Sequence, residues 1–172
     1  VDSFLNHQMD IALMEEIGRE FKRRFGHKQV DKVLTIEASG IGIAAFVAKE
    51  FGVPMVFAKK AKSDNIEGGL YQSDIFSYTY KKKVTLLVSK DWITADDKVL
   101  IVDDFMANGE AMRGLCDVVK LAGAELVGIG IAVEKGFQGG GQRIRNLGIE
   151  LHSLAIVNFT DDGSKIEFVK ES

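Results

Sequence analysis

Two adjacent carboxylates, set between an apolar run and a turn of small residues, are the part of this sequence best suited to chemistry. Residues 99–102 are a continuous apolar run, typical of a strand buried on both faces, and Asp103 and Asp104 follow where such a strand should end facing solvent. The turn at 107–109 has small residues, and apolar side chains then recur at helical spacing over 109–122. Paired carboxylates suit sugar hydroxyls or the waters around Mg²⁺, and the free amides that open a helix suit a phosphate. The stretch therefore predicts a cradle for ribose 5-phosphate at the carboxyl end of a strand.

A simpler interpretation of the same stretch is an ordinary strand-to-helix turn, in which Asn108 caps the helix at 109–122. A cap requires one such residue, however, and does not account for two acids ahead of it. We therefore favour the ligand-binding interpretation.

The elements that must position this cradle alternate between strands and helices. The pattern predicts an amphipathic helix over 8–25, a strand at 33–36, a loop at 37–42, a helix at 43–51, strands at 53–58 and 126–133, a short helix at 141–147, and strands at 149–156 and 165–169. Repeated βαβ units predict an α/β domain over 1–172, with a mainly parallel twisted sheet and flanking helices.

Residues 61–83 interrupt this alternation. They begin with polar residues and two glycines, continue through a partly alternating run at 71–80, and reach three lysines before an apolar run at 84–89. We interpret the segment from about 61 to 90 as a long loop with a β-hairpin that could close over the site as a lid. The alternative is an ordinary solvated hairpin with a lysine-rich turn.

Composition sets outer limits on function. The 172 residues are 46% hydrophobic and carry a net charge of −3, which gives no reason to expect nucleic-acid binding. No apolar run reaches the roughly 18 residues of a membrane-spanning helix. The single cysteine, Cys116, fits a reducing cytoplasm and reads as a small core residue. The three histidines show no metal-ligand spacing.

The thirteen positions of 99–111 resemble the phosphoribosyl-pyrophosphate (PRPP) motif of the type I phosphoribosyltransferases. The resemblance implies that Asp103 and Asp104 are the catalytic residues that contact the ribose hydroxyls. It also implies that the loop amides hold the 5′-phosphate. The positions concerned are Ala107, Asn108, Gly109, Glu110 and Ala111.

The loop after the strand at 33–36 has two interpretations. Its G-x-G-x-x-A pattern from Gly40 is a weak dinucleotide-binding fingerprint, and Lys60 stands where an NAD site would need an acid, which leaves NADP open. The resemblance instead implies a pyrophosphate-binding loop, helped by two lysines that would otherwise read as solvated surface. Its members are Glu37, Ala38, Ser39, Gly40, Lys59 and Lys60.

A third segment, 134–138, resembles the base-recognition segment of the family members that act on 6-oxopurines. It implies that Lys135 donates to the exocyclic oxygen and that Phe137 stacks on the purine ring. Without the resemblance, the two would read as a surface lysine and a core aromatic. Residues 1–8 resemble the family's N-terminal hood, in which Asn6 matches a position that contacts the base. The glycine run at 139–141 departs from the proline-containing stretch usual there.

Taken together, the resemblance implies transfer of ribose 5-phosphate from PRPP to a purine, xanthine in particular, in a salvage reaction. Mg²⁺ would arrive bound to PRPP, without a direct protein ligand, and the family is typically homodimeric and cytoplasmic. No nucleic-acid or membrane partner is implied. Two alternatives remain: a member that prefers guanine or hypoxanthine, and a PRPP-sensing transcription regulator on the same fold. Such regulators carry a DNA-binding domain for which this sequence has no spare segment.

Overall fold

The structure is a computed structural model, which describes residues 5, 8–61, 69–77, 82–160, 163 and 165–169. Its elements in chain order are α1 (Ile11–Phe25), β1 (Lys32–Ile36), α2 (Gly40–Phe51), β2 (Met55–Ala61), β3 (Leu70–Ser77), β4 (Lys82–Ser89), β5 (Lys98–Met106), α3 (Glu110–Ala122), β6 (Glu125–Lys135), the 3₁₀ turn η2 (Gly136–Gln138), α4 (Gly140–Asn146), β7 (Leu151–Phe159) and β8 (Ile166–Val169).

The strands form one sheet in the order β3-β4-β2-β1-β5-β6-β7-β8. Strands β2, β1, β5, β6 and β7 run parallel, and the antiparallel strands are the β3–β4 hairpin on one side and β8 on the other. The predicted α/β class, mainly parallel sheet and hairpin are confirmed. The hairpin is part of this sheet, because β4 pairs with β2.

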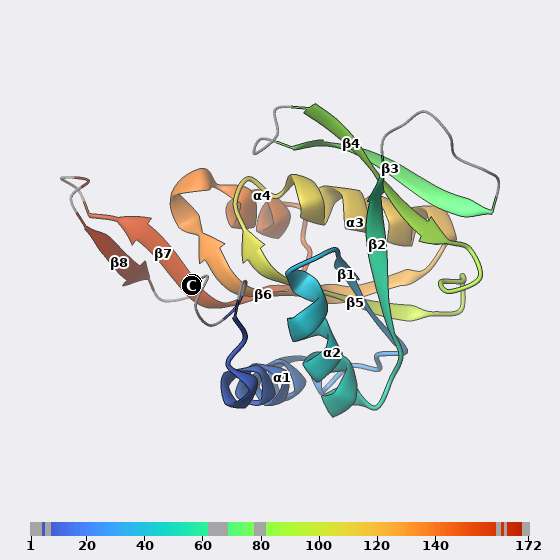
Figure 1. Ribbon diagram of the computed structural model, residues 1–172, viewed down its shortest axis with the longest axis horizontal. Coiled ribbons are helices and arrows are strands. Elements are labelled where there is room, and N and C mark those ends of the chain that lie inside the picture. The colour runs from blue at the N-terminus through green and yellow to red at the C-terminus, as the bar shows by residue number, and fades with distance from the viewer. Residues whose placement is uncertain are drawn as a thin grey trace.

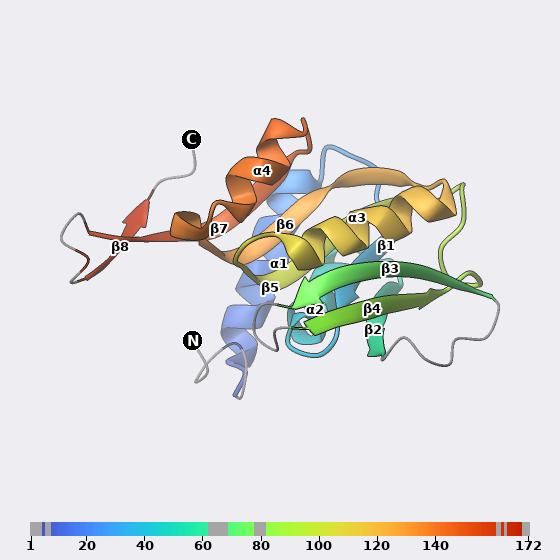
Figure 2. The same ribbon diagram turned by 90° about the horizontal axis from the view of Figure 1, so that it is seen from above.

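The apolar core lies in two layers, one on each face of the sheet. Helices α1 and α2 cover one face, and α3 and α4 lie on the other (Figures 1 and 2). Phe21, Phe25 and Val102 belong to the first layer, whereas Ile101 and Leu115 belong to the second. Residues that alternate along β5 thus serve opposite faces, as the period of a strand requires.

The chain order reverses its direction between β1 and β5. From the central strand β1 the chain moves outward to β2 through α2 on one face, whereas β5, on the other side of β1, leads to β6 through α3 on the opposite face. The loops that leave the carboxyl ends of β1 and β5 therefore diverge. Ligands of open α/β sheets bind at such a point of reversal.

Several predicted bounds were wrong by a few residues. Helix α1 begins at Ile11 rather than residue 8, because Asp10 accepts a hydrogen bond from Leu13 N–H at 3.1 Å and so caps it. Helix α2 begins at Gly40, and the predicted loop of 37–42 shrinks to three residues. Within the described part of the chain, no helix has the length and apolar composition to cross a membrane.

Candidate active site

The acid pair lies near the carboxyl end of β5, but inside the strand and buried. Asp103 pairs in register with Ile131 of β6, and each carboxylate residue exposes only 4% of its surface. The expectation that the two acids face solvent just beyond the strand was wrong. Strand β5 continues to Met106, and its neighbours cover both side chains.

Burial gives Asp103 unusual electrostatics. Desolvation, followed by the neighbouring charge of Asp104, raises the pKa of Asp103 well above its usual value, and the more distant charge of Lys60 opposes this shift. Asp103 Oδ1 accepts a hydrogen bond from Asp104 N–H at 3.0 Å. A ligand that offers hydroxyl donors or a cation would therefore stabilise this carboxylate.

The first residue of α2 closes one side of the acid site. A Cβ atom on Gly40 would lie only 2.3 Å from both Asp103 Oδ1 and Thr35 Oγ1, so helix, strand and acid are in close contact. Thr35 is fully buried, and its hydroxyl has no hydrogen-bond partner within the described part of the chain. Thr35 could not be singled out from the sequence, because a threonine inside a strand is ordinary.

The predicted phosphate loop joins β5 to α3 and is partly exposed. Asn108 Oδ1 accepts the N–H of Glu110 at 3.2 Å, so Asn108 does support the start of the helix, as the simpler interpretation expected. Gly109 holds the N-cap position with φ of +85°, a left-handed conformation that favours glycine. The remaining N–H groups of this first turn have no acceptor inside the helix, which is the property that a phosphate site requires.

The predicted pyrophosphate-binding segment, Glu37 to Gly40, leads from β1 into the first residue of α2, and its first peptide bond, Glu37–Ala38, is cis. Glu37 Oε1 accepts the N–H of Lys60 at 2.5 Å, which fixes the loop against β2. The two exposed lysines are consecutive in β2, so they point to opposite faces. The positive charge of Lys60 favours the ionised form of Asp103 and so opposes the rise in its pKa. Lys59 instead lines a separate hollow of about 840 Å³ with Met55 and Phe57.

The predicted base segment spans the end of β6 and η2. Lys135 Nζ lies 5.5 Å from the centroid of the Phe105 ring, and Phe105 directly follows the acid pair. Phe137 is half exposed, and its ring centroid lies 4.6 Å from that of Phe159 in β7. The structure thus brings Lys135 toward the acid pair, while Phe137 packs beside the neighbouring strand.

Two further predictions concern residues of which the structure describes little or nothing. Asn6 and most of the hood at 1–8 lie outside the described residues, as do 62–68 and 78–81 of the proposed lid. In the described part of the hairpin, Ile75 and Leu86 are buried against α3. Arg113 of α3 also donates to the carbonyl of Asp74 at 2.7 Å. The hairpin is therefore fixed to the helix that follows the phosphate loop.

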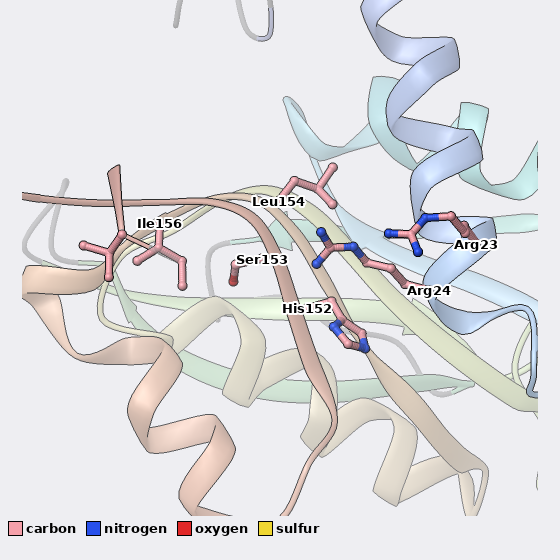
Figure 3. Close-up of a pocket in the computed structure, with 7 residues that line it drawn as sticks. Arg23, Arg24, His152, Ser153, Leu154 and Ile156 are labelled. Carbon is pink, nitrogen blue, oxygen red and sulfur yellow. The ribbon is translucent and has the colours of Figure 1, made fainter. Parts of the chain in front are cut away.

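A hollow of about 690 Å³ lies away from these residues, between the end of α1 and β7 (Figure 3). Arg23 and Arg24 reach it from α1, and His152 and Ser153 reach it from β7. Both arginines form ion pairs with Glu20, and His152 contacts Glu150. The two arginines therefore share one carboxylate, and the hollow contains none of the predicted site residues.

The buried acid pair lies on β5, next to the reversal point of the sheet between β1 and β5. The loops that follow β1 and β5 leave the same edge of the sheet as the buried acid pair, with Lys60 of β2 nearby and Lys135 at the end of β6. Within the described residues, no three His, Cys, Asp or Glu side chains form a metal-binding group. Such a site can hold two anionic groups on either side of a sugar.

Comparison with known proteins agrees with this geometry. Residues 2–153 match the phosphoribosyl transferase domain family, and the chain belongs to that family. The match spans both loops, so it accounts for the glycine pattern at Gly40 without a dinucleotide-binding fold.

Among its relatives, the chain is 57% identical over 168 residues to the xanthine phosphoribosyltransferase of Lachnoclostridium phytofermentans, covering 96% of this chain and 87% of that protein. It is 53% identical over 163 residues to the protein of the same name from Ruminiclostridium cellulolyticum, covering 95% and 86%. Among solved structures, adenine phosphoribosyltransferase from Giardia lamblia matches with a TM-score of 0.75 at 24% identity, over 87% of this chain and 81% of that one. This last likeness confirms the fold.

Proposed function

We propose that the protein is a purine salvage enzyme that transfers ribose 5-phosphate from PRPP to xanthine, giving xanthosine 5′-monophosphate and pyrophosphate. The observation that carries the proposal is the buried acid pair at the reversal point of the sheet, beside the loops that follow β1 and β5. The names and high identity of the relatives support the choice of base.

The chemistry needs no protein nucleophile, because the bond to the leaving pyrophosphate can break through a transition state with positive charge on the ribose. Asp103 and Asp104 would hold the ribose hydroxyls and stabilise that charge. The amides of the loop at Glu37–Gly40 and the Lys60 ammonium would hold the pyrophosphate as negative charge builds on it. Lys59 points to the other face of β2, so its part in this step would require a change of side-chain position or a second subunit.

The residues present fit a Mg²⁺ ion that enters with PRPP. The acid pair is buried, and Asp104 repels charge on Asp103, so a nearby cation or its waters would stabilise both carboxylates. Bound Mg²⁺ supplies neutralisation of the pyrophosphate charge. In this proposal the protein binds the ion through PRPP and contributes the acids and loop amides that orient the two substrates.

Base choice would follow from donors at two positions. Lys135 has only donors, so it favours a 6-oxo group and disfavours the 6-amino group of adenine. Asn6 can donate to the 2-oxo group, which xanthine has and hypoxanthine lacks. Because an amide can also turn and accept from guanine, discrimination at this position should be weaker than at the first.

A panel of xanthine, guanine, hypoxanthine and adenine, each with PRPP and Mg²⁺, tests this function through release of pyrophosphate. We expect xanthine first, guanine and hypoxanthine well behind, and adenine inactive. Asn6→Ala should lower efficiency mainly with xanthine and narrow its advantage over hypoxanthine. If adenine is the best substrate, or if the variant affects both oxopurines equally, the base assignment is wrong.

The same assay separates the enzyme from a PRPP-sensing regulator on this fold, which would bind PRPP without releasing pyrophosphate. An enzyme that prefers guanine or hypoxanthine would show in the order of the panel. We place the reaction in the cytoplasm, in keeping with a single cysteine whose pKa burial raises to about 11 and which therefore stays a thiol.

We also propose a homodimer, supported by the hollow that Lys59 lines on the α2 side of the sheet. Its walls include the partly or fully exposed apolar residues Met55, Phe57, Leu87 and Trp92. Light scattering should give twice the mass of one chain. Because Trp92 is the sole tryptophan and is 60% exposed in one chain, dilution to monomers should shift its emission to longer wavelength.

A further inference from the structure

Helix α4 connects the two ends of the candidate site, although nothing in its sequence suggests a ligand. Its first residue, Gly140, donates its N–H to the carbonyl of Ala107 at 3.2 Å. One turn later, the Arg143 guanidinium donates to the carbonyl of Asn108. Two successive carbonyls of the phosphate loop are therefore directed toward α4.

The direction of these carbonyls determines where the loop amides point. Among the described residues the only cis peptide is Glu37–Ala38, so the peptides after Ala107 and Asn108 are trans. In a planar trans peptide the N–H points opposite to the carbonyl. The N–H groups of Asn108 and Gly109 must therefore point away from α4.

The other half of α4 is anchored beside the base segment. Arg145 binds both carboxylate oxygens of Glu134, at 3.1 and 3.0 Å, and Ser153 donates to the same carboxylate at 2.5 Å. Glu134 is 3% exposed and directly precedes Lys135. One short helix thus holds the phosphate loop at its start and the end of β6 through its last turn.

The glycine run allows this close approach. A Cβ on Gly140 would lie 2.4 Å from the Ala107 carbonyl oxygen, and a Cβ on Gly141 would lie 1.8 Å from Glu134 Oε1. Both distances are far too short for any side chain. The run at 139–141, which departs from the usual family pattern, lets α4 contact the loop and the buried acid at once.

We propose that Arg143 is a positioning residue for the 5′-phosphate subsite: by binding the Asn108 carbonyl it keeps the loop amides directed at the phosphate. The proposal rests on the proposed function. Arg143 is exposed, so its charge alone should contribute little, and its effect should come from the orientation of the loop.

The test compares Arg143→Met, which removes the donors, with Arg143→Lys, which keeps a positively charged donor group, and with Gln142→Met as the control. Gln142 is the adjacent exposed residue of α4, and its amide contacts only Asn146 among the described residues. Steady-state kinetics give KM for PRPP and for xanthine. Calorimetry gives Kd for xanthosine 5′-monophosphate, which carries a 5′-phosphate, and for pyrophosphate with Mg²⁺, which does not.

We expect Arg143→Met to raise KM for PRPP and Kd for the nucleotide by about tenfold, in the range for a lost charge-assisted hydrogen bond. KM for xanthine and Kd for pyrophosphate should stay within about twofold. Arg143→Lys should recover part of the loss, and Gln142→Met should resemble wild type.

Unchanged nucleotide affinity in a folded Arg143→Met protein would overturn the proposal, as would an equal loss for nucleotide and pyrophosphate, which would indicate a general structural role. The melting temperature of each variant identifies such a role. If Arg143→Met does not fold, Arg143→Lys and Arg143→Gln carry the same comparison. Failure of the proposed function looks different, because wild type itself would then release no pyrophosphate from PRPP and xanthine.

Discussion

Strands β5 and β6 are neighbours, and each has buried acidic side chains near its carboxyl end. The surroundings of these side chains differ sharply. Glu134 in β6 is bound by Arg145 and Ser153, so the charge and both oxygens of this buried carboxylate are satisfied within the chain. Asp103 in β5 is equally buried, yet it faces a second acid and has no ion-pair partner among the described residues. Burying charge without a partner is costly, so the β5 pair destabilises the fold of the free protein.

The difference separates Asp103, whose carboxylate is suited to a ligand, from Glu134, whose carboxylate stabilises the fold. A carboxylate whose partners are all internal contributes to position and stability. Carboxylates that burial and a like charge disfavour are common in catalytic sites. The predictions below compare the two strand ends in decreasing order of expected effect.

The largest effect concerns the acid pair. Asp103→Asn combined with Asp104→Asn should lower kcat/KM by about a hundredfold or more, because the ribose is no longer held in position. The expected loss is measured as pyrophosphate release with PRPP and xanthine, on protein shown by circular dichroism to be folded. Activity close to wild type in the folded double variant would remove the ribose assignment.

The second effect concerns stability at the end of β6. Glu134→Gln should lower the free energy of unfolding by about 2–3 kcal/mol, somewhat below the range for fully buried ion pairs, because Arg145 loses its charged partner but remains partly exposed. Urea unfolding gives the value. Glu125→Gln is the matched control at the other end of β6, where the side chain is 66% exposed and its nearest cation is 3.9 Å away. It should change stability by less than about 0.5 kcal/mol.

The third effect concerns Lys135, which directly follows Glu134. Lys135→Met should lower kcat/KM with every 6-oxopurine. The loss should correspond to about 2 kcal/mol of transition-state stabilisation, which lies within the range for a hydrogen bond to a charged group. Lys120→Met on the exposed side of α3 serves as the control for loss of one positive charge. A loss confined to xanthine, or an equal loss in both variants, would contradict a contact with the 6-oxo group.

The sequence allowed much of this fold to be predicted, because apolar runs between turn residues identify strands and helices whichever way they later pack. It did not reveal that Asp103 and Asp104 are buried, since acidic residues after an apolar run normally mark a solvated end. Here the backbone of Asp103 stays paired with Ile131, and tertiary contacts close over both side chains.

The contact between Arg143 and Asn108 could not be predicted from the sequence either. The two residues are 35 positions apart, and they meet only because α4 packs against the loop after β5. No periodicity or short motif encodes a contact of that kind. The phosphate loop, in contrast, is contiguous in sequence, and its amide-presenting turn could be recognised directly from 99–111.

The smallest effect is a gain in stability, whereas the effects above are losses. It measures how much burial of the acid pair destabilises the folded protein. Burial and Asp104 raise the pKa of Asp103 in the folded protein above its unfolded value of about 3.9. Between these two values the folded state binds more protons than the unfolded state, so the stability contributed by Asp103 is present below about pH 4 and is lost as pH rises through the folded pKa. Asp103→Asn cannot ionise and avoids this loss.

The single variant Asp103→Asn should therefore be more stable than wild type at pH 7. The gain should shrink as pH is lowered toward 4. Urea unfolding of both proteins from pH 4 to pH 8 measures it, with the Glu134→Gln variant as the contrasting case that is destabilised at pH 7. Addition of PRPP with Mg²⁺ should reverse the order of stability at pH 7. Wild type should bind PRPP more tightly than Asp103→Asn does, so the ligand should raise the free energy of unfolding of wild type by more. If Asp103→Asn is instead less stable than wild type at every pH, the pair at the end of β5 is a structural feature like Glu134, and the contrast between the two strand ends does not hold.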